Sequence, residues 1–158
     1  NLFKSAVVCF AVVAMCGCFQ GQPSQTPGQG ASATTSSGVD DIKQAAANGD
    51  ADAQLKLARL YAEGDVVRED AAEAAKWYRL AAEQGQSDAQ VWLGMAYETG
   101  KGVPTDKVEA YAWFDVASAN IKNAEVRRDG IKALLSSSQL SLAERHATEL
   151  VEKYGNEK

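Results

Sequence analysis

An internal repeat with a period of 36 residues constrains this chain more than any other feature of its sequence. Aligned without gaps, residues 51–86 and 87–122 share twelve identities. These identities are Asp52/Asp88, Ala53/Ala89, Gln54/Gln90, Leu57/Leu93, Tyr61/Tyr97, Gly64/Gly100, Val67/Val103, Asp70/Asp106, Glu73/Glu109, Ala74/Ala110, Trp77/Trp113 and Ala81/Ala117. Apolar residues recur inside each copy at intervals of three and four, which is the period of one buried helix face. Each copy is therefore predicted to be a helix–loop–helix unit that packs against the next copy.

The residues between the two apolar stripes of a copy predict where its helices end and begin. Gly64 and Gly100 can adopt the left-handed conformation that ends a helix. Asp70 and Asp106 follow six residues later and are good N-caps for a second helix. The one tryptophan of each second helix has an alanine three residues before it and another four residues after it, and it is predicted to lock the helix pairs together in the core.

The residues that recur in register resemble those of Sel1-like repeats, which are related to tetratricopeptide repeats. AQLKLARLYAEGDVVREDAAEAAKWYRLAAEQG and AQVWLGMAYETGKGVPTDKVEAYAWFDVAS share Ala-Gln, Leu, Tyr, Gly, Val, Asp, Ala, Trp and Ala at matching positions. The resemblance implies an all-α fold, a short α-solenoid with Sel1-like repeats at 51–86 and 87–122. Residues 42–50 resemble the second half of a preceding unit, and residues 39–50 are predicted to form an N-terminal capping helix.

Residues 123–158 are predicted to form two C-terminal capping helices, because helical patterns continue after the repeats stop. Asn123 is a candidate N-cap for the first of these helices, and Gly130 weakens its middle. Ser136 and Gln139 have the spacing of a capping box in front of the second helix.

Residues 1–17 are predicted to form a signal peptide of the lipoprotein type. They hold a short apolar run from Ala6 to Met15, which is too short to span a bilayer core of about 30 Å as a helix and fits the core of a signal peptide. The end of the segment resembles a bacterial lipobox, whose cysteine is lipidated and becomes the mature N-terminus. Cys18, which follows a small residue, fits that position better than Cys16. An ordinary cleaved signal peptide is the alternative.

Residues 18–38 are predicted to be the lipidated cysteine followed by a disordered tether. The segment carries no charge and consists mainly of Gln, Gly, Ser, Thr and Pro, so it cannot bury enough apolar surface to offset the entropy lost on ordering. The residue after the cysteine is Phe19 rather than an aspartate, which resembles lipoproteins sorted to the Gram-negative outer membrane. We therefore expect a domain held at the bacterial cell envelope and facing the periplasm.

The sequence offers no pattern typical of catalysis, a metal site or a cofactor. All three cysteines lie in the first 18 residues, so the repeats contain neither a thiol nucleophile nor a cysteine metal pair. The single histidine, His146, lies near Glu144 and Glu149 in the last predicted helix and is expected to be a surface residue. A formal net charge of −5 argues against a nucleic-acid partner.

A candidate binding surface follows from the solenoid, because solenoids bind along a concave surface that the first helix of each unit lines. Outside the apolar stripe, the residues predicted to make contacts are Lys56, Arg59 and Glu63 in the first unit and Trp92 and Met95 in the second. Their mixed apolar and basic character suits an acidic or aromatic peptide segment. The alternative is that Trp92 packs against the closing helices.

These features together predict an exported, non-catalytic module for protein–protein interaction that a lipid anchor tethers to the envelope. One alternative is an envelope hydrolase or β-lactam-binding protein like the cysteine-rich Sel1-like proteins, against which the absence of cysteines from the repeats argues. The other alternative is a structural or regulatory lipoprotein that binds the cell wall.

Overall fold

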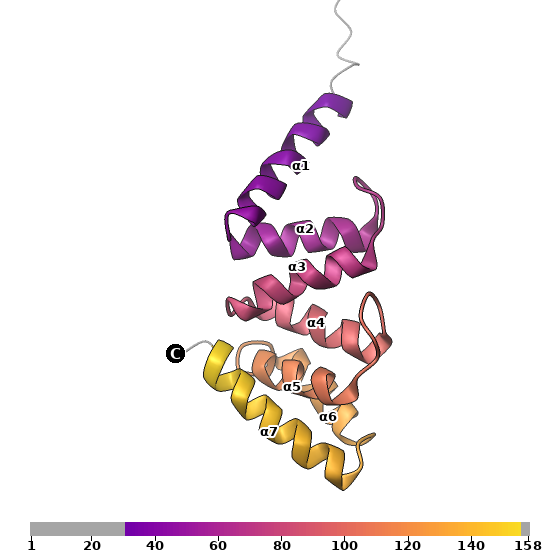
Figure 1. Ribbon diagram of the computed structural model, residues 1–158, viewed down its shortest axis with the longest axis vertical. Helices are drawn as coiled ribbons and strands as arrows, with labels where there is room; N and C mark the ends of the chain where they lie inside the picture. Colours follow the sequence, from indigo (N-terminus) through magenta and orange to yellow (C-terminus); the bar gives the residue numbers. More distant parts are fainter. Residues whose placement is uncertain (1–30, 156–158) are drawn as a thin grey trace, which may run out of the picture.

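The computed structural model describes residues 31–155 of the chain, and all regular structure within that range is helical (Figure 1). The helices are stacked along the long axis, with α1 at one end and α6 and α7 at the other. Their bounds are α1 (Ala31–Ala47), α2 (Ala51–Glu63), α3 (Ala71–Glu83), α4 (Ser87–Thr99), α5 (Lys107–Ser118), α6 (Lys122–Lys132) and α7 (Ser137–Tyr154). The pairs α2–α3 and α4–α5 are the two predicted repeats, so the all-α solenoid with capping helices is confirmed.

The first helix is longer than the sequence predicted. α1 begins at Ala31, inside the segment predicted as a tether, and ends at Ala47 rather than at residue 50. Residues 31–37 hold no proline or glycine, so a helix anchored by the packing of Val39 and Ala46 can extend backwards through them. The predicted signal peptide, Cys18 and most of the predicted tether lie outside the described residues.

The predicted helix ends of the two repeats are confirmed. Gly64 and Gly100 are left-handed, with φ of 74° and 77°, and their N–H groups bond back to the last turns of α2 and α4. The side chain of Asp70 accepts hydrogen bonds from two backbone N–H groups of the first turn of α3, and Asp106 does the same for α5. Such caps satisfy donors that a helix leaves unpaired at its start.

The capping box of α7 is confirmed, because Ser136 and Gln139 each bond to the backbone of the other. The predicted cap at Asn123 was wrong, because α6 begins at Lys122 and its N-cap, two residues before Asn123, is Ile121, which makes no side-chain cap bond. The backbone N–H of Ile121 still bonds to the carbonyl of Ala117 at 2.9 Å, so the turn that leaves α5 leads directly into α6.

The glutamine of the repeated Ala-Gln pair forms a hydrogen bond from each repeat to the helix before it. Gln54 and Gln90 are both buried, although they are polar. Gln54 Nε2 donates to the carbonyl oxygen of Ala46 at 3.1 Å, and Gln90 Nε2 donates to that of Ala82 at 3.2 Å. These carbonyls lie in the last turns of α1 and α3, where each also accepts a backbone N–H from the turn that follows, of Gly49 and Gly85 respectively. One side chain therefore fastens each repeat to the helix before it.

The main core runs through both repeats and ends on α5, which packs against α4, α6 and α7. Trp113 is buried, as predicted, whereas Trp77 is half-buried and contacts both this core and a smaller cluster around Ala46 and Leu57. α6 and α7 each pack on α5 rather than forming another close helix pair. The last two helices thus cover the end of the solenoid without repeating its geometry.

Two glycines at equivalent positions show how the packing changes along the chain. Gly94 in α4 lies directly against Phe114, and a Cβ atom placed on it would be 2.9 Å from the Cε1 atom of that ring. Gly130, 36 residues later in α6, has nothing within 4 Å of the same position. α4 is therefore tightly packed against α5 at Gly94, whereas α6 has open space at Gly130.

Candidate functional site

A groove opens between the two repeats, with small residues at its base. Its volume is about 280 Å³. The residues that line this alanine groove are Ala62, Glu63, Glu69, Ala71, Ala74, Ala75, Tyr78, Trp92, Met95, Ala96, Thr99 and Lys101. α2 supplies one wall and α4 the other, while the alanines of α3 lie between them.

Aromatic stacking fixes the wall around Trp92. The rings of Trp92 and Tyr78 are stacked, with centroids 5.9 Å apart and planes 13° apart. The guanidinium carbon of Arg59 lies 5.9 Å from the centroid of the Trp92 ring, within the range of a cation–π contact. Trp92 nevertheless keeps 38% of its surface exposed, so this large aromatic side chain remains available to a partner.

Tyr78 lies deeper than Trp92 and has only 5% of its surface exposed. Burial raises the pKa of Tyr78 to about 12, and the positive charge of Arg59 acts in the opposite direction. The phenol is therefore neutral at any physiological pH, and the groove presents an apolar interior with charges at its edge.

The structure brings together four of the five residues predicted to make contacts. Glu63, Trp92 and Met95 line the groove, and Arg59 lies over Trp92. Lys56 is exposed but does not line the groove, since it lies seven residues before Glu63, about 10 Å along α2. The ring of Trp92 stacks on Tyr78 of α3 and lies under Arg59 of α2, so these aromatic and cation–π contacts are both made with the first repeat.

Sequence reasoning missed the contribution of the second helix to this groove. Ala71, Ala74, Ala75 and Tyr78 recur at intervals of three, one and three, so they share one face of α3. The contacts were predicted on the first helix of each unit, so no residue of this face was among them. This face does pack against α2 and α4, but its alanines are too small to fill the space between them.

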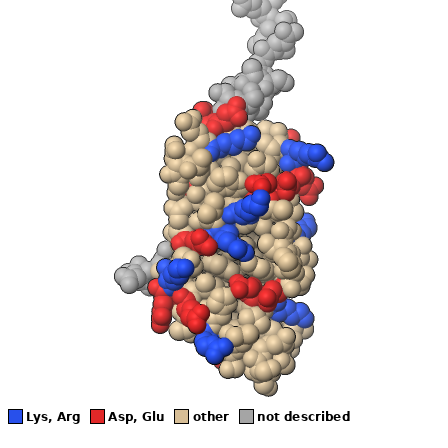
Figure 2. Space-filling model, viewed as in Figure 1, with Lys and Arg blue, Asp and Glu red and all other residues tan. Residues whose placement is uncertain are grey.

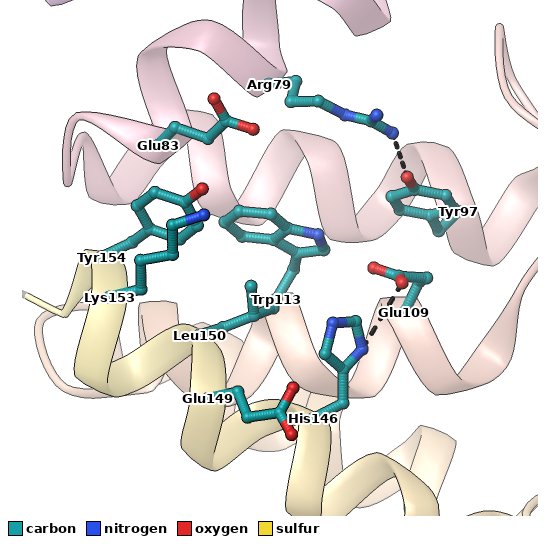
Figure 3. Close-up of a pocket in the computed structure, with 10 residues that line it drawn as sticks. All are labelled: Arg79, Glu83, Tyr97, Glu109, Trp113, His146, Glu149, Leu150, Lys153 and Tyr154. Atoms are coloured by element: carbon teal, nitrogen blue, oxygen red, sulfur yellow. Dashed lines mark hydrogen bonds and ion pairs between the residues drawn. The ribbon is translucent and has the colours of Figure 1, made fainter.

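A second cavity, of about 290 Å³, lies where α7 crosses α5 (Figure 3). We call it the polar cup, and its lining residues are Arg79, Glu83, Tyr97, Glu109, Trp113, His146, Glu149, Leu150, Lys153 and Tyr154. In Figure 3, Arg79 and Glu83 extend from α3 on one side, and His146, Glu149 and Lys153 extend from α7 on the other. Trp113 lies between them and stacks on Tyr154, with centroids 6.0 Å apart.

Cross-helix polar contacts hold the polar cup together. His146 Nδ1 lies 3.4 Å from Glu109 Oε1, with about 29% of each side chain exposed, so the histidine is a half-buried partner of α5 rather than a free surface residue. Arg79 donates a hydrogen bond to the Tyr97 hydroxyl, and burial raises the pKa of Tyr97. These two contacts join α3 to α4 and α5 to α7.

The described residues contain no group of three or more His, Cys, Asp and Glu side chains that could hold a metal ion. Among the helices of residues 31–155, none is both long and apolar enough to cross a bilayer. Figure 2 shows lysines and arginines interspersed with acidic side chains over the face in view. That face therefore offers no broad basic surface of the kind that binds nucleic acid.

Comparison with known proteins identifies the repeats. The Sel1 repeat family matches residues 51–86 and 87–120, which are the two helix pairs on either side of the alanine groove. The chain carries two Sel1 repeats. No curated protein matches the chain significantly.

Two solved structures are similar over most of this Sel1 repeat chain. One is a protective antigen present in uropathogenic Escherichia coli strains that displays an SLR fold; it is 42% identical over 74% of this chain, with a TM-score of 0.71. The other is a Sel1 repeat protein from Oxalobacter formigenes, 34% identical over 75% of this chain, with a TM-score of 0.56. The matched regions cover only 26% and 36% of those two proteins. Sel1 repeats typically mediate protein–protein interaction on a non-catalytic scaffold.

Proposed function

We propose that this protein is a protein–protein interaction module and that the alanine groove receives a peptide segment of its partner. The observation that carries the proposal is the exposed Trp92, which stands at the groove with Arg59 stacked over it and Met95 beside it on α4. Tryptophan and arginine are the residue types most enriched among the side chains that dominate binding energy at interfaces.

The size and lining of the groove favour part of a protein over a small molecule. Its volume of about 280 Å³ lies just below the ~300–1,000 Å³ typical of small-molecule sites. Its base is formed by alanines, and its edges carry both signs of charge, from Glu63, Glu69 and Lys101. Such an arrangement accommodates one large side chain at the bottom while the neighbouring residues of the partner meet the charged edge.

We further propose that the domain acts at the bacterial cell envelope, facing the periplasm and anchored to the outer membrane through a lipid on Cys18. The support is the sequence of residues 1–38, where a short apolar run precedes the cysteine and an uncharged Gln-, Gly- and Ser-rich segment follows it. A test is to replace Cys18 with alanine: the lipidated protein fractionates with outer membranes, and the Cys18→Ala protein should not. Equal fractionation of both proteins would contradict the anchor.

Photo-crosslinking in intact cells tests the groove. The photoreactive residue would replace Met95, which lines the groove, and in separate proteins Lys56 or Lys132, which are exposed outside it. We expect Met95 alone to give a discrete adduct, whose mass identifies the partner. Adducts from Lys56 or Lys132 without one from Met95 would move the binding surface elsewhere and refute the groove.

A further inference from the structure

The two repeats differ at the base of the alanine groove, and the difference is a missing aromatic ring. Ala75 of the first repeat aligns with Tyr111 of the second. The neighbouring groove residues Tyr78 and Met95 align in the same way with Phe114 and Ile131, 36 positions later in each case. At these three positions the second repeat and α6 therefore carry one aromatic ring more than the first repeat and α4, whereas Trp92 aligns with Arg128.

This equivalent site in the second repeat is closed. Tyr111 has 5% of its surface exposed, Phe114 has none, and Ile131 has 2%. Burial of this ring in turn raises the pKa of the Tyr111 phenol. A tyrosine supplied by the second helix is thus part of the closed core at this position of the second repeat.

The same position in the first repeat holds only a methyl group. Ala75 is itself buried and lines the alanine groove, together with Tyr78 and Trp92, which are stacked on one another. An aromatic side chain buries roughly 150–250 Å², and aromatic rings gain further from offset or edge-on contact with other rings. A methionine thioether, such as that of Met95, also contacts aromatic rings favourably.

We propose that the alanine groove binds an aromatic side chain, Tyr or Phe, of a partner peptide, in the place that the ring of Tyr111 occupies in the second repeat. The proposal rests on the proposed function and adds the chemical class of the anchor residue. The occupant is a short segment of another protein whose ring packs between Trp92 and the alanines of α3. Its backbone then lies at the charged edge beside Glu63 and Lys101.

The substitution Ala75→Tyr tests the proposal by giving the first repeat the ring that the second repeat already has. The matched control is Ala133→Tyr, which adds the same side chain at an exposed position after α6. A random peptide display library would be selected against the full 158-residue chain, and recovered peptides would be titrated against all three proteins. We expect an aromatic residue in every enriched peptide and roughly thirtyfold weaker binding to Ala75→Tyr, the loss typical of removing an anchor contact. Ala133→Tyr should bind as the unsubstituted chain does.

A second measurement uses only the unsubstituted chain and so does not depend on the folding of the variant. The probe is p-cresol, the side chain of tyrosine, and the readout is the NMR signals of the Trp92 indole N–H and the Met95 methyl group. We expect saturable shifts of both signals, with no saturable shift of the Trp77 indole. An absence of saturable shifts overturns the aromatic anchor.

The selection separates the two proposals. Enriched peptides without aromatic residues that still compete with Met95 crosslinking would overturn the aromatic anchor and leave the proposed function intact. Enriched peptides that bind Ala75→Tyr unchanged would overturn the groove itself. If no peptide were enriched while p-cresol saturated the Trp92 and Met95 signals, the groove would accept an aromatic ring and the proposed peptide binding would be wrong.

Discussion

Replacing Gly94 with alanine should destabilise the protein, although alanine is the better helix former. The substitution favours α4 by about 1 kcal/mol through helix propensity. Against this, the new methyl group would lie 2.9, 3.0 and 3.2 Å from three carbons of Phe114. Phe114 has no exposed surface into which it could move, and overpacking of such a core costs about 1–3 kcal/mol. We therefore expect Gly94→Ala to lower the free energy of unfolding by about 1 kcal/mol.

Gly130→Ala is the matched control, because it makes the same change at the equivalent position of α6. Nothing lies within 4 Å of the added methyl group there, so only the helix propensity changes and stability should rise by about 1 kcal/mol. Denaturant unfolding followed by circular dichroism measures both variants, and their midpoints should shift in opposite directions with unchanged slopes. Equal stabilisation of both variants would show that Phe114 relaxes freely, and it would refute the argument from close packing.

Two further predictions concern the cap of α5 and the buried phenol. Asp106→Ala should lower the free energy of unfolding by about 1 kcal/mol, because two N–H groups of α5 lose their acceptor. Asparagine can also cap a helix, so an Asp106→Asn variant no more stable than Asp106→Ala would contradict this reason. The pKa of Tyr78 is about 12 in the folded protein and ~10 in the unfolded chain. Between these two pH values only the unfolded state loses the proton, so the free energy of unfolding falls by about 2–3 kcal/mol as the pH rises. Stability below pH ~10 should not depend on this group. Tyr78→Phe should flatten that alkaline decline in urea unfolding measured across the pH range, and an unchanged decline would refute the assignment.

The fold could be predicted from the sequence where its signals are local. Gly64 and Asp70 act within one turn of their own helices, so their roles could be deduced from residue type and spacing alone. The start of α1 could not be predicted in this way. Alanine, serine and threonine are compatible with either a tether or a helix, and here packing of the following turns decides between them.

The groove was only partly predictable because its shape depends on how three helices cross. The contact residues on α2 and α4 could be predicted from the helix faces that they share. Which of the α2 residues reach the groove depends on their position along the helix, and Lys56 lies too near the start of α2 to line it. The difference between Ala75 and Tyr111 can be read from the aligned repeats. The structure was needed to show that Tyr111 is buried in the core whereas Ala75 lines an open groove. The polar cup had no signal in the repeat, because α7 crosses α5 outside the 36-residue pattern.

The packing of α1 determines how the protein would respond to a mechanical load. α1 packs mainly on α2, through a small cluster that includes Ala46 and Leu57, and Gln54 is bonded to its last turn. A force applied to the chain on the N-terminal side of Ala31 would act on the contact between α1 and α2 before it acts on the main core. Because repeat structures open one neighbour at a time, α1 would detach first. The groove is lined by no residue of α1, so detachment of this helix would leave all of its lining residues in place.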